Sequence, residues 1–397
     1  MILYLPSAIA FGYVTVTLVY LLSHAGVSVS EIAGLVALLF FPQTWKVLWA
    51  PIVDTTLTSK RWYVISAAAT GLLTLGTAYV PAKEGSLWLL DVLVLALSIA
   101  SCASSMATES LMAHTTAPDQ QGRAGGWLQA GNLGGGGLGG GAGLWLGQHV
   151  AAWSAGVVLG LACVACCATL LLVTQPSRAR GVLSYRAEII VVGRDVWGVV
   201  RSRAGFLALL LFVLPIGTGS ASNLWAAVAD DWRASADTVA LVNGVLGGLI
   251  AMVGCFVGGY LCDVIDRTTG YVLFGIALAV CAVAMAIGPR TSAMFVILTC
   301  VYFFFTGCIY AAFTGVVLET IGTGAAATKY NLMSSIGNIP IAYVTLIDGW
   351  AQTRLGSGGM LYTEAALGIV GVIVFIGIAL ATRSRAVAAD DRSPRIA

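Results

Sequence analysis

Twelve apolar runs divide this chain, and each is long enough to cross a lipid bilayer as a helix. A crossing needs about 20 apolar residues. Its backbone must also satisfy its own hydrogen bonds in lipid, which a helix does. The sequence therefore predicts an all-α membrane protein with twelve spanning helices. The predicted spans are residues 2–23, 30–53, 62–80, 87–113, 124–148, 151–174, 206–229, 237–262, 271–288, 293–320, 325–348 and 361–382.

The composition fits a lipid environment and excludes other classes of protein. Hydrophobic residues make up 58% of the chain and charged residues only 10%, whereas soluble domains carry about 25% charged residues. The net charge of +2 gives no reason to expect nucleic-acid binding. The cysteines fall inside apolar runs, so burial explains Cys163, Cys166 and Cys167 more simply than a redox or zinc site. We therefore expect no cofactor and no metal site. We also expect no cleaved signal peptide, because the first apolar run is followed directly by others.

A single long polar stretch, between Thr174 and Gly205, divides the predicted helices into six and six. We predict an N-terminal six-helix bundle at 1–174, a cytoplasmic linker at 175–204, a C-terminal six-helix bundle at 205–382 and a cytoplasmic tail at 383–397. Within the linker, Leu183–Val200 is amphipathic and is predicted to lie along the membrane surface as a helix. That helix is either a passive tether or a regulatory element.

The lysines and arginines predict the orientation of the chain, because these residues concentrate in cytoplasmic loops. With the N-terminus inside, fifteen of them fall in inner loops or the tail and four in outer loops. Both termini are therefore predicted to be cytoplasmic, with the protein in the plasma (inner) membrane. The inner set is Lys60, Arg61, Arg123, Arg178, Arg180, Arg186, Arg194, Arg201, Arg203, Arg267, Lys329, Arg383, Arg385, Arg392 and Arg395. The outer set is Lys83, Arg233, Arg290 and Arg354.

The two halves repeat weakly in the positions of their acidic residues. Asp54 ends the second predicted span and Asp263 ends the eighth, 209 residues later. Glu109 lies near the inner end of the fourth span and Glu319 near that of the tenth, 210 residues later. Six-helix internal repeats are typical of secondary transporters, whose substrate site lies between the repeats.

Lys46, Glu109 and Glu319 are the ionisable residues that stand out within the predicted spans. Each costs about 2.5–3.5 kcal/mol to insert, so it should face the protein interior or a cavity. Lys46 either reaches the inner surface or forms a fixed ion pair, or it faces a cavity. In a cavity it would bind an anionic solute or pair with Glu109 during the transport cycle. Loss of water favours the protonated form of a carboxyl group. Glu109 and Glu319 are therefore candidates for proton coupling, with a permanent ion pair as the alternative for each.

The charges at the inner helix ends suggest a gate. Asp54 precedes Lys60 and Arg61, and Asp263 precedes Arg267. Such residues form a charge lock that closes one conformation, or they only solvate helix ends and set the topology.

The glycine-rich run Gly131–Gly143 lies in an apolar setting without the GK[ST] of a phosphate loop. We expect it to let helices pack closely, or to bend as a gate. Polar and aromatic residues at helical spacing are candidates to line a substrate cavity, although each one is equally a packing residue. Together with Lys46 these substrate-binding candidates are Tyr4, Ser7, Ser105, Thr218, Ser222, Trp225, Tyr310, Tyr330, Ser334 and Asn338.

Several motifs resemble those of the major facilitator superfamily. The segment GGYLCDVIDR (Gly258–Arg267) is similar to the superfamily's G-x-x-x-D-R loop. The run WKVLWAPIVD (Trp45–Asp54) resembles the K-x-L-W-x-P-x-x-D run of the muropeptide permease (AmpG-like) branch, which also includes siderophore importers and acetyl-CoA transporters. The runs Ala117–Gly136 and Ala327–Trp350 look like this branch too. Its fourth helix tends to carry two acidic residues four apart, but this chain has Ser105 and Glu109 there.

The resemblance implies two pseudo-symmetric six-helix bundles and a monomeric carrier that works by alternating access. It implies proton-coupled import of a polar or anionic solute that is muropeptide-, siderophore- or acyl-CoA-like. The alternative is proton-driven efflux of small molecules by the same fold. The three histidines, His24, His114 and His149, lie far apart near helix ends and form no reactive cluster. We therefore expect no enzyme activity.

Overall fold

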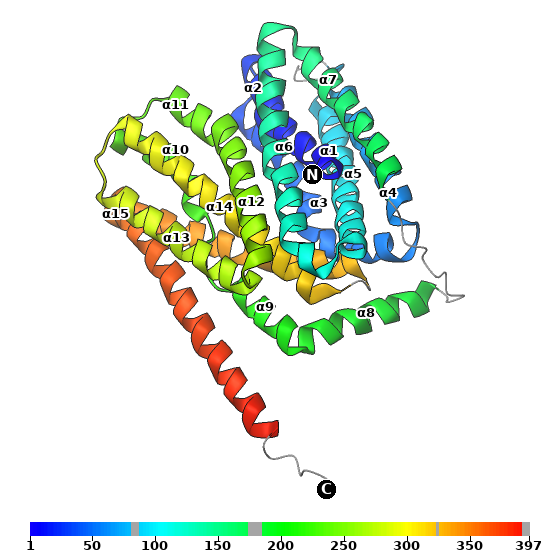
Figure 1. The fold of residues 1–397 in the computed structure, drawn as a ribbon. Coiled ribbons are helices and arrows are strands. Elements are labelled where there is room, and N and C mark those ends of the chain that lie inside the picture. The colour runs from blue at the N-terminus through cyan, green and yellow to red at the C-terminus, as the bar shows by residue number, and fades with distance from the viewer. Residues whose placement is uncertain (81–86, 174–184, 323–324, 391–397) are drawn as a thin grey trace.

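The computed structural model describes residues 1–80, 87–173, 185–322 and 325–390, and every regular element in these ranges is a helix (Figure 1). The fold class predicted from the apolar runs is therefore confirmed. In the first half the helices are η1 (Ile2–Tyr4), α1 (Leu5–Gly12), η2 (Tyr13–Leu18), α2 (Val19–His24), α3 (Val29–Thr55), α4 (Ser59–Thr77), α5 (Leu87–Thr115), η4 (Pro118–Gln120), α6 (Gln121–His149), α7 (Ala152–Ala165) and η5 (Cys166–Leu172).

The linker helix α8 (Tyr185–Arg201) connects the halves and matches most of the predicted amphipathic segment, whose first two residues lie outside the described ranges. The loop and tail cations Lys83, Arg178, Arg180, Arg392 and Arg395 also lie outside them. The second half contains α9 (Arg203–Val213), η6 (Ser220–Leu224), α10 (Trp225–Val228), η7 (Ala229–Trp232), α11 (Ala236–Leu241), η8 (Val242–Leu246), α12 (Gly247–Val264), α13 (Arg267–Ile287), α14 (Ser292–Ile321) and α15 (Ala326–Asp390).

Eight helical segments in the described ranges are both long and apolar enough to span a membrane, and the bent pair α8–α9 raises that number to nine. The other crossings lack one of the two properties. The glycines and polar residues of α6 and α4 lower their hydropathy. The long helix α15 counts once but bends at Gly356, where φ is 72°, and Figure 1 shows its orange and red arms running in different directions. The predicted spans 325–348 and 361–382 lie on these two arms.

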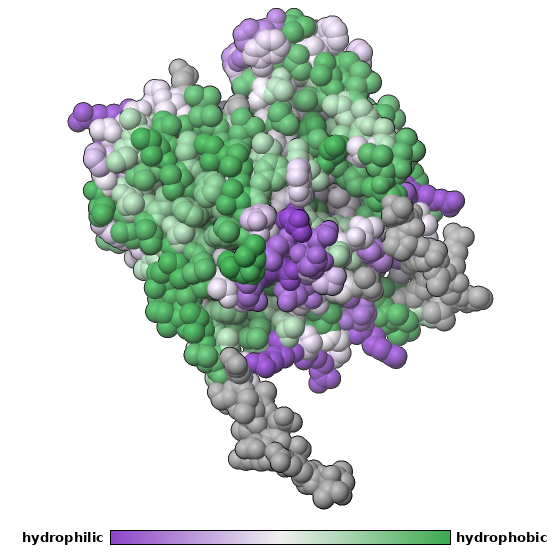
Figure 2. Space-filling model, viewed as in Figure 1, coloured by the Kyte–Doolittle hydropathy of each residue, from purple (hydrophilic) through white to green (hydrophobic). Residues whose placement is uncertain are grey.

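Each half has its own apolar core. The larger cluster of buried residues runs from Ala208 to Phe375, and the second runs from Ile9 to Cys163. Apolar side chains also cover the flanks of the molecule, whereas hydrophilic ones gather between the lower ends of α6 and α12 and along the lower edge (Figure 2). This distribution suits a protein that has lipid around its sides and water at its ends.

The glycines of α6 let this helix approach both halves at backbone distance. A Cβ atom added to Gly126 would lie 2.5 Å from the carbonyl oxygen of Cys255 on α12. One added to Gly12 on α1 would collide with the backbone of Gly136. Both distances are too short for any side chain, so α6 packs closely against α1 and α12, as its composition predicts.

Candidate functional site

A central cavity of about 680 Å³ lies between the two halves of the chain. This volume falls within the usual range of pockets for drug-sized ligands. Its walls come from η1, α1, η2, α3, α5 and α6 on one side and from the second half, including α12, α14 and α15, on the other. The apolar part of the wall includes Phe11, Phe40, Leu144, Phe303 and Phe313. The polar part includes Gln43, Lys46, Glu109, Gln129, Asn132, Thr218, Asn243, Thr306, Tyr310, Tyr330 and Asn338.

Lys46 brings the positive charge of α3 into this cavity. The side chain lies in the cavity wall and is only 8% exposed, so it does not reach the surface in the way that a boundary lysine would. It interacts electrostatically with Glu109, which lines the same cavity. No ion pair within 4.0 Å joins the two groups among the described contacts. The wall of the cavity therefore contains both a cation and a carboxyl group.

Glu109 connects the two halves through hydrogen bonds. Its Oε1 accepts a hydrogen bond from Tyr4 Oη at 3.4 Å, and its Oε2 accepts one from Asn331 Nδ2 at 2.9 Å. Tyr4 lies in the first turn of the chain, whereas Asn331 lies on α15 of the second half. Glu109 itself is fully buried at the end of the hydroxyl-bearing face of α5. Its carboxyl group is thus held by residues that must separate if the halves move apart.

A second polar chain crosses between the halves beside Glu109. Gln129 of α6 donates a hydrogen bond to Thr314 of α14 at 2.9 Å, and Thr314 shares a 3.2 Å hydrogen bond with Tyr330 of α15. Asn132 donates to Gln129 at 3.0 Å. These groups give the cavity wall both donors and acceptors.

Below the cavity, at the end of the helices where α8 lies, Asp54 joins α3 to the start of α15. Its Oδ1 accepts a hydrogen bond from the backbone N–H of Ala327 at 3.1 Å. Its Oδ2 accepts from Thr328 N at 2.8 Å and from Thr328 Oγ1 at 2.7 Å. A carboxylate at a helix N-terminus satisfies backbone donors that lack partners and interacts favourably with the helix dipole.

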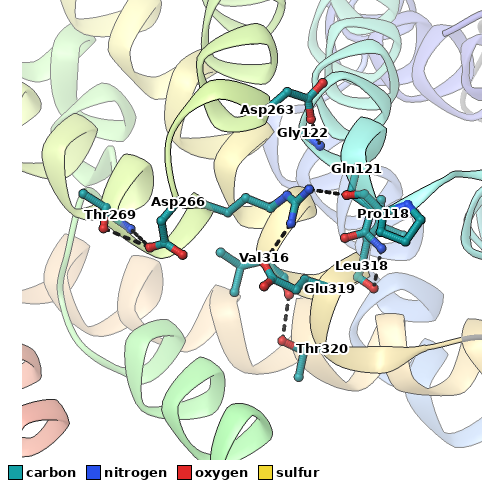
Figure 3. A network of polar contacts seen from close by, with 11 residues as sticks. Pro118, Gln121, Gly122, Asp263, Asp266, Thr269, Val316, Leu318, Glu319 and Thr320 are labelled. Carbon is teal, nitrogen blue, oxygen red and sulfur yellow. Dashed lines mark hydrogen bonds and ion pairs between the residues drawn. The ribbon is translucent and has the colours of Figure 1, made fainter.

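Asp263 makes the corresponding contact with the other half. Its Oδ1 accepts a hydrogen bond from Gly122 N at 2.8 Å in the first turn of α6. Its Oδ2 accepts from Arg123 Nε at 2.6 Å and from Arg123 N at 3.2 Å. Figure 3 shows Asp263 reaching Gly122 from the neighbouring helix. The two aspartates thus hold the halves together at one end of the cavity.

Arg267 adds a third crossing at the same end. Its Nη1 donates to Glu319 Oε2 at 3.0 Å, and its Nη2 donates to the carbonyl of Pro118, in the short connection before α6. Gln121 of α6 donates to the Leu318 carbonyl at 3.4 Å, and the close-up in Figure 3 shows these residues around one junction. Glu319 belongs to this junction at the end of α14, and its side chain is 53% exposed.

The linker helix α8 is tied to the same region by an ion pair. Lys329 Nζ lies 2.9 Å from Asp195 Oδ2, and Lys329 is 3% exposed. Lys329 follows directly after the residues that Asp54 caps, so α8 is anchored beside one of the two caps.

The sequence matches the family model of the Major Facilitator Superfamily over residues 1–345. The chain belongs to the major facilitator superfamily. Among curated protein sequences, none matches this chain closely.

Solved structures of other facilitators share the fold. The fucose:proton symporter of E. coli has a TM-score of 0.72 at 13% identity, covering 94% of this chain and 96% of that one. The proton:xylose symporter has a TM-score of 0.65 at 12% identity, with 94% and 93% covered. A bacterial homologue of the iron transporter ferroportin, in an outward-facing state, has a TM-score of 0.64 at 16% identity, with 95% and 96% covered. At these identities the likeness shows the shared fold.

This facilitator brings most of the predicted cavity residues together. Tyr4, Ser7, Lys46, Thr218, Ser222, Tyr310, Tyr330, Ser334 and Asn338 all line the central cavity, as does Glu109. Ser105 does not line it; this side chain is buried, and its hydroxyl donates to the Cys102 carbonyl of α5 at 2.9 Å. Trp225 also lies elsewhere. It is fully buried and its ring packs edge-on against Tyr302, 5.2 Å away.

The predicted gate residues occupy the closed end of the facilitator, but with other partners. Asp54 and Asp263 bind helix N-termini in the opposite half. Lys60 Nζ donates to the Leu170 carbonyl at 3.2 Å, and the Arg61 backbone N–H donates to the capping hydroxyl of Thr58. Glu319, predicted as a proton-coupling candidate, pairs with Arg267 outside the cavity wall, whereas Glu109, the other candidate, lines the cavity.

The sequence reasoning missed several polar groups of the facilitator's cavity. Gln129 and Asn132 are polar residues three apart within the glycine-rich helix, a spacing that places them on one helix face. Asn331 binds Glu109 from the neighbouring half. Its position three residues before the predicted candidate Ser334 is the only signal that the sequence offers for it.

Proposed function

We propose that this facilitator imports a polar or anionic solute across the plasma (inner) membrane together with protons. The observation that carries the proposal is the buried pair of Lys46 and Glu109 in one large cavity, with Glu109 bound from both halves by Tyr4 and Asn331. Lys46 is the residue that we assign to an anionic group of the solute. Glu109 is the group that we assign to the coupled proton.

The proposed cycle depends on what happens to the contacts of Glu109. A solute or a proton that competes for its carboxyl group weakens the bonds to Tyr4 and Asn331, and these bonds hold the halves in one arrangement. A ligand shifts a conformational equilibrium only through different affinities for the two states. Binding at Lys46 and Glu109 meets this condition, because the surroundings of both residues change when the halves rock.

The orientation completes the proposal. With both termini in the cytoplasm, the caps of Asp54 and Asp263 close the cytoplasmic end, and the cavity is the outward-facing one. The moving bodies are then the bundles at 1–174 and 205–382, joined by the linker at 175–204.

The solute class follows from the likeness of the run Trp45–Asp54 to the muropeptide permease branch, since this run contains both Lys46 and the capping Asp54. The cavity of about 680 Å³ and its mixture of aromatic and polar walls suit such a solute. We therefore propose a muropeptide-, siderophore- or acyl-CoA-like molecule.

Thermal unfolding of the purified protein with a panel of ligands tests this proposal. The panel is anhydro-muropeptides, ferric and iron-free siderophores, and acetyl-CoA. A ligand at about 100 times its Kd stabilises the folded state by roughly 2.7 kcal/mol. The ligand that stabilises is then supplied to proteoliposomes, with and without a pH gradient. If none of the three ligand classes stabilises the protein, the proposed solute class is refuted. If accumulation is the same with and without the pH gradient, the proposed proton coupling is refuted.

A further inference from the structure

Two buried acids in the second half take no part in the central site. Asp348 and Glu364 lie on the two arms of α15, on either side of the bend at Gly356. Asp348 is 0% exposed and Glu364 is 7% exposed. The two carboxyl groups interact electrostatically with one another. A carboxylate within a membrane protein needs a partner, so such a pair indicates a functional site.

Hydrogen bonding leaves three oxygen atoms of this pair unsatisfied. Glu364 Oε1 accepts a hydrogen bond from Tyr302 Oη at 2.5 Å and another from Ala221 N at 3.1 Å. Glu364 Oε2 and both carboxyl oxygens of Asp348 are buried and have no hydrogen-bond partner. Buried polar atoms without partners are rare, and each one requires an explanation.

Glu364 lies beside a break in a membrane helix. The helix α9 ends at Val213, and the chain then passes through Pro215 and two glycines with positive φ, Gly217 at 62° and Gly219 at 70°, before η6 begins. Non-helical backbone at membrane depth is tolerated only where it is buried in protein or lines a cavity. Here Glu364 accepts a hydrogen bond from the backbone N–H of Ala221, which lies just after the break. Discontinuous helices of this kind form the ion sites of many transporters.

Glu364 also lines a small cavity of its own. It is lined by Pro215, Gly217, Thr218, Glu364 and Gly368 among others, and has room for about one water molecule. Gly217 and Thr218 also line the central cavity. The two cavities thus share part of their walls.

We propose that Asp348 and Glu364 form a proton-binding site of the second half, which exchanges its proton with the central cavity past Gly217 and Thr218. Two ionised carboxylates that interact in a medium of low dielectric constant repel one another. One bound proton removes this repulsion and makes its carboxyl group a hydrogen-bond donor. The other titratable groups facing the pair are Tyr302, which already donates to Glu364, and the Cys281 thiol of α13. The nearby cation Arg290 is held by Ser357 and the Trp232 ring.

In the proposed transport cycle this site would be a second proton-binding position besides Glu109. Only its part in coupling rests on the proposed function; its existence does not. Its existence is tested without any transported solute, by infrared spectroscopy of the purified full-length protein in detergent as the pH is raised. A protonated carboxyl group gives a C=O band that is separate from the amide bands. Because Glu109 is assigned a proton of its own, the titration is run in the Glu109→Gln protein. There we expect the band to disappear as the pH is raised, and we expect adding Asp348→Asn or Glu364→Gln to remove most of it. Adding Asp91→Asn, which changes an acid near the start of α5, should keep it.

Asp348→Asn keeps the test decisive if Glu364→Gln fails to fold, because Asp348 makes no hydrogen bond that the substitution would break. Gel filtration and thermal unfolding check that each variant is folded. A band that keeps its full size when Asp348→Asn is added overturns the proposal, and so does its absence from the Glu109→Gln protein. Thermal unfolding in sodium and in choline salts gives a further check. If sodium stabilises the unaltered protein more than choline does, and Asp348→Asn abolishes this difference, the proposal is overturned, because the site would then hold a metal cation.

Discussion

Asp54 and Asp263 end equivalent helices of the two halves, and each caps the first turn of a helix in the opposite half. Asp54 binds α15 and Asp263 binds α6, so the two contacts are related by the internal repeat of 209 residues. Both contacts lie at one end of the cavity and both must break for that end to open. The closed end is thus held by helix capping across the halves, in addition to ion pairs.

Removing one cap should open this end more often. We expect Asp263→Ala to cost about 0.5–2 kcal/mol of the closed state, the usual effect of losing an N-cap. Amide hydrogen exchange in the first turn of α6, at residues 121–126, should become faster by about 2- to 30-fold. Asp266→Ala is the control, because Asp266 caps only its own helix through Thr269. Equal exchange in Asp263→Ala and the unaltered protein would show that the cap contributes nothing to closure.

The two caps should act on one equilibrium. If Asp54→Ala and Asp263→Ala each destabilise the same closed state, their free-energy effects should add within about 0.5 kcal/mol in the double variant. Exchange at the start of α15 should then rise in Asp263→Ala as well, although Asp263 does not touch α15. Exchange that rises only at the helix whose cap is lost would indicate local fraying without movement of the halves.

Lys46 should determine affinity for an anionic solute. With the ligand that stabilises the protein, we expect Lys46→Ala to weaken binding by about 10-fold or more, which corresponds to 1.4 kcal/mol. Lys60→Ala is the matched control, since Lys60 lies at the closed end and donates to the Leu170 carbonyl. Unchanged affinity in a folded Lys46→Ala protein would remove Lys46 from the solute site.

A substitution at Glu109 should stop proton coupling without stopping the movement of the two halves. We expect Glu109→Gln to abolish accumulation driven by a pH gradient in proteoliposomes while solute exchange without a gradient continues, because glutamine keeps hydrogen bonding but cannot ionise. Glu319→Gln should retain coupling, since Glu319 pairs with Arg267 outside the cavity. If Glu319→Gln loses proton coupling and Glu109→Gln keeps it, the proton-binding role belongs to Glu319.

The ion pair between Asp195 and Lys329 should stabilise the attachment of α8. Lys329 is 3% exposed and Asp195 is partly exposed, so we expect Asp195→Asn to cost about 1–3 kcal/mol, between the values for surface and buried pairs. The double variant Asp195→Asn with Lys329→Met should recover part of this loss, because no buried charge is left unpaired. Thermal unfolding measures both effects, and Arg194→Gln, on the adjacent residue, serves as the control.

Hydropathy predicted the helices of this chain well because lipid leaves the backbone so few alternatives. It failed where the chain departs from a regular helix. The span predicted at 206–229 is broken after Val213, which is why Thr218 and Ser222 face the cavity but Trp225, at helical spacing from them, packs in the core. Pro215 and the two following glycines were the signal for this break.

The partners of the charged residues were harder to predict. Asp54 binds residues 273 and 274 positions away, a pairing that local sequence does not encode. Asp348 went unnoticed because the predicted span ended there, whereas the first arm of α15 continues to Gly356. The sequence thus predicted some of the ionisable residues within the membrane but not Asp348 or Glu364, and tertiary packing decided which of them meet.

The glycine-lined contact of α6 has a consequence for how the halves move. Gly122 and Gly126 lie against Gly259, and Gly248 lies against the Leu133 carbonyl, so much of this contact is backbone on backbone. Side chains also meet here, since the Trp127 ring packs against Phe256 at 4.7 Å. The glycine contacts nevertheless leave few side chains that must change rotamer when one helix rolls over the other. The two halves can therefore rotate about this contact at a low energetic cost. A Cβ atom added at Gly126 or Gly259 would lie within 3.0 Å of the facing backbone, so alanine at either position should push the two helices apart.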